Sequence, residues 1–184
     1  EAVGQVSIAK VPTTPDNQAV GVMAAIAQVG ADCAELSLLL HGTTTTTNAL
    51  LEKKIAQCGL ITTAGFRDVL ELGRRTRPNS YGLIGSFEPL ISREYRLEVP
   101  ERMDADGNVV TALDEDAVRR AALELVEMGC ESLVIHFLHA YANNSHEVRA
   151  TEIAAQVWPN SHITYGSAIL AEFREYERGV AAAV

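Results

Sequence analysis

Apolar positions along this chain follow two alternating spacings, and the alternation predicts an α/β fold. Residues 58–62 are a short, largely apolar stretch, and residues 131–138 have the wholly apolar centre Leu133-Val134-Ile135; both are typical of buried strands. Residues 115–128 instead place apolar side chains every three or four positions, which is the spacing of a helix with one buried face. Because strand and helix signals keep alternating, we expect a mixed, largely parallel sheet with flanking helices.

Shorter signals of the same kinds complete the expected order of elements. Asp106 and Gly107 predict a hairpin turn, and Asp114 and Gly129 predict the two ends of the 115–128 helix. Further strands are expected at residues 3–11, 36–40, 96–99, 102–110 and 163–165. Further helices are expected at residues 15–29 (capped within residues 13–14), 49–54, 66–75, 146–158 and from 171 onward.

One long irregular stretch interrupts this order. Residues 76–91 contain Pro78, Gly82, Gly85 and Pro89, and a stretch of this length without regular structure is typical of a binding loop or a mobile lid. The sequence does not say which of the two it is.

Composition narrows the classes of partner. Hydrophobic residues make up 47% and charged residues 21% of the 184 residues, as in ordinary globular domains. The net charge of −9 argues against nucleic-acid and anionic-membrane binding, and no apolar run reaches the roughly 20 residues of a membrane-spanning helix. Three widely spaced cysteines suggest no disulfide framework, which favours a cytoplasmic location. Small molecules and other proteins remain as the classes of binding partner.

A hydroxyl-rich stretch after the 36–40 run is the first candidate site. A helix start behind a strand end presents free backbone N–H groups, which bind anions and polarised carbonyls. His41 is the candidate catalytic residue because an imidazole donates or accepts a proton near neutral pH. Thr and Asn are also ordinary helix caps, so a purely structural loop is the competing interpretation. The candidate substrate- or phosphate-binding residues beside His41 are Gly42, Thr43, Thr44, Thr47 and Asn48.

A basic segment after the 58–62 strand is the second candidate. Arg67 follows the turn residue Gly65, and Arg74 lies at the end of the short helix expected after it. A guanidinium group matches carboxylates and phosphates, and ligands of open α/β sheets collect beyond strand ends. A solvated basic face is the alternative.

Three histidines near the 131–138 strand raise the question of a metal. The spacing of His136, His139 and His146 fits no recognised zinc pattern, so we expect no metal site. We expect His136 to be satisfied within the sheet and His146 to open the following helix. Glu101 and Arg102 are expected to form an ion pair or anchor a loop.

The candidate segments belong to a longer series of motifs that covers almost the whole chain. The motifs are Thr13-Thr14-Pro15, His41-Gly42-Thr43-Thr44, Thr47-Asn48-Ala49-Leu50-Leu51, Thr62-Thr63, Gly65-Phe66-Arg67-Asp68, Gly73-Arg74, Glu101-Arg102, Asp106-Gly107, Phe137-Leu138-His139, Tyr141-Ala142-Asn143 and Glu175-Tyr176-Glu177-Arg178. In this order they resemble the N-terminal region of the hydantoinase A and 5-oxoprolinase family, which also includes subunits of acetone and acetophenone carboxylases.

The resemblance implies an actin-like ATPase (ribonuclease H-like) domain in a hydrolase such as N-methylhydantoinase or 5-oxoprolinase. ATP and Mg²⁺ in the parent protein would phosphorylate the carbonyl oxygen of a cyclic amide before its ring opens. The implied partner is a subunit of the hydantoinase B type or the remainder of the same chain. Two alternatives stay open: an ATP-using subunit of an acetone- or acetophenone-type carboxylase, and a non-catalytic interaction domain of the same fold.

The sequence also departs from the family pattern. A glycine-rich Asp-x-Gly-Gly-Thr phosphate turn and the C-terminal half are missing, Asn144 replaces a usual Pro, and residues 179–184 lack the expected Thr-containing ending. The chain starts without Met and stops without a turn signal. We therefore expect residues 1–184 to be one N-terminal domain fragment that is inactive and binds no cofactor by itself.

Overall fold

The structure, a computed structural model, describes residues 4, 6–52, 55–74, 81 and 89–184. The chain divides into two compact units, Glu1–Thr46 and Thr47–Val184, and each is described by itself. Most of the expected 76–91 irregular stretch lies outside the described residues.

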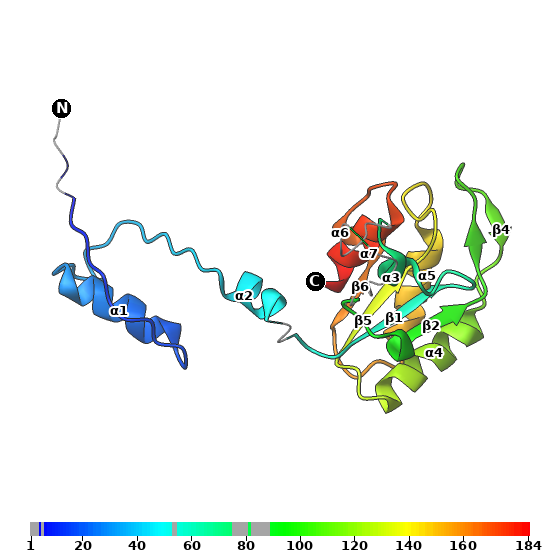
Figure 1. Cartoon of the computed structure of the whole chain (residues 1–184), viewed down its shortest axis with the longest axis horizontal. Helices are drawn as coiled ribbons and strands as arrows, with labels where there is room; N and C mark the ends of the chain where they lie inside the picture. Colours follow the sequence, from blue (N-terminus) through cyan, green and yellow to red (C-terminus); the bar gives the residue numbers. More distant parts are fainter. Residues whose placement is uncertain (1–3, 5, 53–54, 75–80, 82–88) are drawn as a thin grey trace. The chain divides into compact units, whose positions relative to one another are not determined.

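A four-stranded parallel sheet forms the centre of the second unit (Figure 1). Its strands follow the order β2-β1-β5-β6, so the chain builds the sheet outward from β1 in both directions. The expected strands at residues 58–62, 96–99 and 163–165 are confirmed, and the predicted fold class is confirmed with them. The strands are β1 Cys58–Thr63, β2 Arg96–Val99, β5 Ser132–His136 and β6 Ile163–Tyr165.

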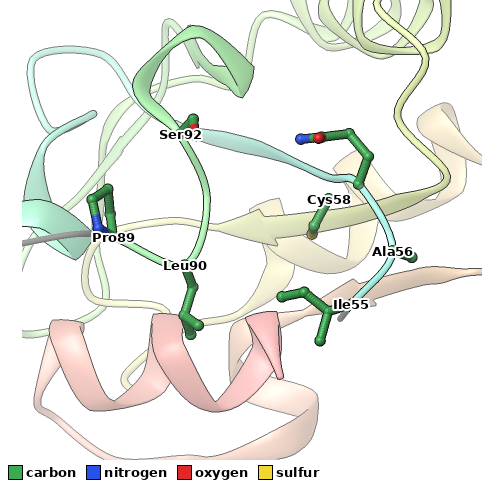
Figure 2. Close-up of a pocket in the computed structure, with 7 residues that line it drawn as sticks. Ile55, Ala56, Cys58, Pro89, Leu90 and Ser92 are labelled. Carbon is green, nitrogen blue, oxygen red and sulfur yellow. The ribbon is translucent and has the colours of Figure 1, made fainter. Parts of the chain in front are cut away.

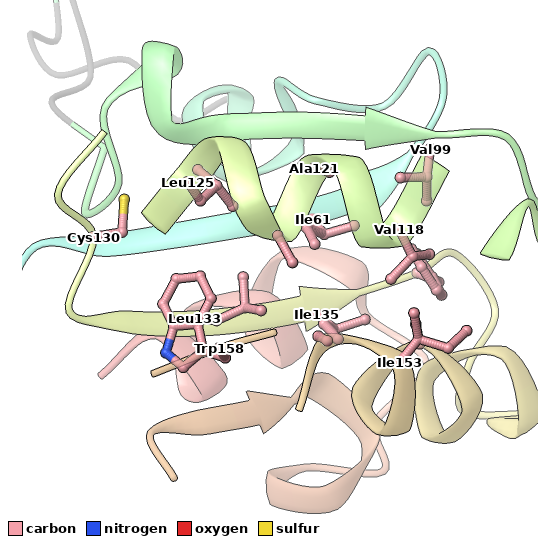
Figure 3. Close-up of a cluster of buried hydrophobic side chains, with 14 residues drawn as sticks. Ile61, Val99, Val118, Ala121, Leu125, Cys130, Leu133, Ile135, Ile153 and Trp158 are labelled. Carbon is pink, nitrogen blue, oxygen red and sulfur yellow. The ribbon is translucent and has the colours of Figure 1, made fainter. Parts of the chain in front are cut away.

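The sheet separates two hydrophobic cores because successive side chains of a strand point to opposite faces. On one face, Ile61 and Ile135 pack with residues of α4 (Glu115–Glu127) and α5 (Ser145–Ala154), as Figure 3 shows. On the other face, Leu60 and Val134 pack with residues of α3 and α7. The short helix α3 is Val69–Leu72, and α7 is Glu175–Ala183.

The helix α4 begins and ends where the sequence predicts. The Asp114 side chain accepts a hydrogen bond of 2.8 Å from the Ala117 N–H, which satisfies one of the free donors of the first turn. At the other end Gly129 has a φ of 83°, a left-handed conformation that glycine adopts without strain.

A small antiparallel hairpin follows the edge strand β2. It pairs β3 (Arg102–Met103) with β4 (Val109–Thr111). The Asp104 carboxylate accepts hydrogen bonds from the backbone of Asp106 and Asn108, and Gly107 has a φ of 83°. The predicted turn at residues 106–107 is therefore confirmed.

The first unit contains the helix α1, Gln18–Gln28. Asn17 caps it by accepting a hydrogen bond of 3.0 Å from the Ala19 N–H, so the expected cap within residues 13–14 is wrong. Thr14 instead ties the turn together, because its hydroxyl donates to the Asn17 carbonyl and accepts from the Gly21 N–H.

Two expected strands are wrong. Residues 6–11 and 36–40 form no strand, and Leu38 and Leu40 are 70% and 84% exposed. A strand needs a neighbour for its backbone N–H and C=O groups, and no described residue pairs with either segment. An apolar run alone does not supply that neighbour.

Several element bounds also differ from expectation. The helix α2 is Thr45–Leu51 rather than 49–54, α5 ends at Ala154, and α7 starts four residues later than expected. A short unpredicted helix, α6 (Gly166–Ile169), follows β6. No helix of the described residues has the length and apolar character needed to span a membrane.

Candidate functional site

Buried polar side chains gather at the carboxyl ends of β1, β2 and β5. This is the side of an open parallel sheet where ligands usually bind. Burying such groups costs free energy unless they find partners, so their concentration here calls for an explanation. We call the following set the carboxyl-edge cluster: Thr63, Glu101, His136, Glu147, Glu175 and Arg178.

The first part of the cluster joins three elements around Glu101. The Thr63 hydroxyl donates to one oxygen of the Glu101 carboxylate and accepts a hydrogen bond of 3.0 Å from the Leu138 N–H. The other Glu101 oxygen lies 2.9 Å from Nδ1 of His146. Glu101 is therefore a buried loop anchor, as expected, and His146 starts the helix α5 in the predicted place.

Glu147 is fully buried and uses both carboxylate oxygens. It accepts hydrogen bonds from the Phe137 N–H at 3.0 Å and from the backbone and hydroxyl of Ser167 at 2.9 and 2.6 Å. Burial raises the pKa of Glu147, although these donors act in the opposite direction. The carboxylate therefore fixes the chain where it leaves β5.

Arg178 is also fully buried and anchors α7 to the sheet. Its guanidinium donates to the carbonyls of Glu172 at 2.7 Å and Phe137 at 2.9 Å, and it pairs with the Glu175 carboxylate. Burial raises the pKa of Glu175, while Arg178 acts to lower it. The ion pair lies one helical turn apart on the same helix.

We expected the side chain of His136 to find hydrogen-bond partners within the sheet, and this expectation is wrong. Neither ring nitrogen has a hydrogen-bond partner among the described residues. The nearest carboxylate oxygens belong to Glu175, 3.6 Å from Nε2, and Glu147, 3.9 Å from Nδ1. The ring fills space beside Gly166 and Gly179, where a Cβ would lie 2.8 and 3.0 Å from it. Burial lowers the pKa of His136 to about 3, so the ring is neutral at pH 7.

This neutral histidine predicts a loss of stability in acid. Between pH 6.5 and 3 the unfolded chain binds a proton on His136 that the folded protein excludes. The free energy of unfolding should therefore fall as the pH drops below 6.5, by about 1.4 kcal/mol per pH unit for one proton. The raised pKa values of Glu147 and Glu175 act in the opposite direction, so the contribution of His136 must be isolated by substitution.

The measurement is denaturant unfolding at pH 7, 6 and 5 for the wild type and for His136→Asn. The variant should lose less stability than the wild type between pH 6.5 and 5. The exposed His162, changed to Asn, is the matched control and should keep the wild-type pH dependence. Equal slopes for His136→Asn and the wild type would contradict the assignment.

Arg67 and Arg74 lie in the second unit and differ in how far they are exposed to solvent. The half-buried Arg67 contributes its backbone: its N–H donates to Glu98 at 3.3 Å and its carbonyl accepts from Arg96 at 3.1 Å. Arg74 is exposed and pairs with Glu177. It lines a surface pocket of about 450 Å³ together with Arg174, Glu175 and Tyr176. The pocket brings the Gly73-Arg74 and Glu175–Arg178 motifs together.

The hydroxyl-rich stretch falls on both units. His41, Gly42, Thr43 and Thr44 are exposed residues of the first unit, and the Thr43 hydroxyl lies 3.3 Å from Oε1 of Gln18. Thr47 and Asn48 are exposed residues of α2 in the second unit. The candidate roles of His41 and of Arg67 and Arg74 stay predictions. The strand expected before this stretch is absent, whereas the helix after it is present.

A second pocket lies at the opposite, amino end of β1. It has a volume of about 200 Å³, and Figure 2 shows Ile55, Cys58 and Leu90 around it. Burial raises the pKa of the Cys58 thiol, which disfavours the thiolate form that reacts as a nucleophile. Among the described residues, no group of three His, Cys, Asp or Glu side chains is placed to hold a metal ion.

Sequence reasoning missed the buried Glu147 and Arg178 and the partly buried Glu175 as site residues. The charged run at residues 171–178 predicts a helix but does not indicate that Arg178 is fully buried. A usable signal was present, because Glu175 and Arg178 are spaced three apart and so share one helix face.

Comparisons with known proteins identify the family. A sequence model described as the hydantoinase/oxoprolinase N-terminal region matches residues 1–158. An uncharacterized protein of Methanocaldococcus jannaschii is 40% identical over 93% of this chain and 26% of its own length. The acetophenone carboxylase gamma subunit of Aromatoleum aromaticum is 30% identical over 97% of this chain and 28% of its own length.

A solved structure shows the same relation at the level of the fold. The ATP-dependent caprolactamase from Pseudomonas jessenii superposes on all of this chain with a TM-score of 0.85 and 28% identity, over 28% of its own chain. This chain thus spans about a quarter of the length of the relatives it matches. The resemblance drawn from the motifs is confirmed, and the chain belongs to the hydantoinase/oxoprolinase family as its N-terminal region.

Proposed function

We propose that this region is part of an ATP-dependent hydrolase that opens a cyclic amide of the hydantoin or 5-oxoproline type. The observation that carries the proposal is the match of the whole chain to an ATP-dependent caprolactamase, because a caprolactam is a cyclic amide. A 5-oxoprolinase of Arabidopsis thaliana, 29% identical over 78% of this chain, supports the same class of substrate.

The proposed chemistry is activation of a poor electrophile. The γ-phosphoryl group of ATP moves to the amide oxygen, ADP leaves, and water then adds to the carbon that carries the phosphorylated oxygen. The C–N bond of the ring then breaks, with the ring nitrogen leaving as the protonated amine and the carbon remaining as an acyl phosphate. A second water hydrolyses the acyl phosphate to the carboxylate and free phosphate. Donors aimed at the transferring group supply most of the stabilisation in such reactions.

The residues that would take part are those of the hydroxyl-rich stretch and the basic segment. His41 is proposed to donate a hydrogen bond or a proton to the developing charge. Gly42, Thr43, Thr44, Thr47 and Asn48 are proposed to bind substrate or phosphate oxygens, and Arg67 and Arg74 to bind an anionic group. The described residues offer hydroxyl and guanidinium donors that suit phosphate oxygens. They offer no acidic group of three for Mg²⁺, so no step is assigned to the metal.

The region is proposed to work with other polypeptide segments in the cytoplasm. The relatives include a carboxylase gamma subunit and a caprolactamase subunit alpha. These names support a partner subunit as a source of the remaining catalytic groups. The proposed partner is a subunit of the hydantoinase B type or further domains in the same polypeptide.

A ketone carboxylase subunit is the second candidate, because the acetophenone carboxylase gamma subunit matches 97% of this chain. A non-catalytic interaction domain is the third. In that case the fold would be kept while the hydroxyl-rich stretch has no chemical role.

One experiment separates the three candidates. The complete protein that carries this region, with its partner subunit, is assayed for ATP turnover with 5-oxoproline, a hydantoin and caprolactam. Parallel assays use acetone and acetophenone with bicarbonate. We expect a cyclic amide to raise ATP turnover at least about tenfold, since such enzymes lower barriers by many kcal/mol. The 184-residue chain alone is the control and should be inactive.

Stimulation by the ketones alone would support the carboxylase and contradict the hydrolase. Absence of ATP turnover with every compound would contradict both enzymes and favour the interaction domain.

A further inference from the structure

The backbone that leaves β5 is held by side chains from three other elements. The Phe137 N–H donates to Glu147 of α5 at 3.0 Å, and the Phe137 carbonyl accepts from Arg178 of α7 at 2.9 Å. Buried backbone groups are normally paired by a neighbouring strand. Beyond the end of β5, side chains take over that task, so this segment has a defined position without being part of the sheet.

The next two residues are held in the same way. The Leu138 N–H donates to the Thr63 hydroxyl at 3.0 Å, and the His139 N–H donates to Oε1 of Glu175 at 3.1 Å. Thr63, Glu147 and Arg178 are buried. Every one of these anchors is itself hydrogen-bonded or ion-paired, which limits the movement of His139.

His139 is the residue at which this segment turns away from the sheet. Its φ of 57° makes it the one residue other than glycine, among those described, with a left-handed backbone. Glycine would adopt this conformation without strain, and histidine does so at some cost. Strained residues persist where the surroundings fix them, and they cluster at functional sites. The anchors of the preceding paragraphs are such surroundings.

No hydrogen bond within the described residues uses the imidazole of His139. Its Nδ1 is buried and has no hydrogen-bond partner among the described residues. The ring rests edge-on against Tyr141, with centroids 5.9 Å apart and planes at 68°, and the residue is partly exposed. A ring held firmly, partly exposed, and not used for hydrogen bonding within the fold is suited to contact a ligand.

We propose that His139 contacts the ligand of this region and donates a hydrogen bond to an oxygen atom of the phosphorylated or phosphorylating group. The inference rests on the proposed function and extends it to a residue outside the hydroxyl-rich stretch. The oxygen belongs either to a phosphate of the nucleotide or to the amide carbonyl, and both are hydrogen-bond acceptors of the same kind.

The test is His139→Asn in the complete protein. Asparagine tolerates a left-handed backbone, so the loop should fold as before and the melting midpoint should stay at or above that of the wild type. The value of kcat/KM for the cyclic amide should fall about 10²-fold, which is typical for loss of one donor to a developing oxyanion. His162→Asn makes the same change at an exposed position and should leave both quantities unchanged.

The kinetic constants also identify the oxygen. A raised KM for ATP with every substrate points to a nucleotide phosphate, and a lowered kcat with an unchanged KM for ATP points to the amide oxygen. A variant with kcat/KM within twofold of an active wild type would overturn this inference and leave the proposed function standing. An inactive wild type would overturn the proposed function itself and this inference with it.

Discussion

Changing Arg178 to Ala is expected to lower the free energy of unfolding of the second unit by about 3–5 kcal/mol, the usual result of breaking a buried, hydrogen-bonded ion pair. The guanidinium is fully buried and satisfies the carbonyls of Glu172 and Phe137 as well as the Glu175 carboxylate. Without it, a largely buried negative charge and two carbonyls lose their partner. Urea unfolding of the 184-residue chain at pH 7 measures the effect.

Two further variants test whether the loss of the charge partner of Glu175 causes the lower stability of Arg178→Ala. Arg149 forms ion pairs with Glu115 and Glu152, yet it is exposed, so Arg149→Ala should leave the unfolding midpoint near that of the wild type. Arg178→Met combined with Glu175→Gln removes both charges and should recover part of the lost stability. An Arg178→Ala protein as stable as Arg149→Ala would contradict this account.

The parts of the fold that the sequence predicted are those fixed by local pattern. The strand β1 is buried along its whole length and begins with an apolar run because both of its faces are covered, and α4 has an apolar face between the cap Asp114 and the stop Gly129. The run at residues 36–40 has the same apolar character, but it forms no strand. Strand formation depends on a partner that lies elsewhere, and no local pattern reports whether the partner is present.

Some candidate site residues could also be predicted from local sequence pattern, and others depend on contacts between distant parts of the chain. Glycine, threonine and arginine next to a predicted strand end are local signals, and they led to the hydroxyl-rich stretch and to Arg74. The carboxyl-edge cluster was not predicted as a unit because its members come from β1, the segment after β2, β5, α5 and α7, and their burial results from packing between those parts of the chain. From the sequence, His139 was considered only as a possible metal ligand. Its left-handed backbone conformation is visible only in the structure.

Changing His41 to Ala in the complete protein is expected to lower turnover about 10²-fold or more, which corresponds to about 3 kcal/mol of transition-state stabilisation. The reason is the proposed role of the imidazole as a donor to a developing oxyanion or as a proton carrier. His41 is exposed, so the melting midpoint should change little.

The control and the opposite outcome follow from the competing structural interpretation. If His41 only supports the local backbone, its loss should cost about 1 kcal/mol of stability, the usual net value of one hydrogen bond, and leave turnover nearly intact. His162→Ala removes an exposed imidazole far from the candidate residues in sequence and should change neither quantity. Turnover and thermal unfolding measured on the same three proteins decide the matter. A lowered melting midpoint with unchanged turnover would remove His41 from the catalytic residues and, with it, the main reason to place the reaction at the hydroxyl-rich stretch.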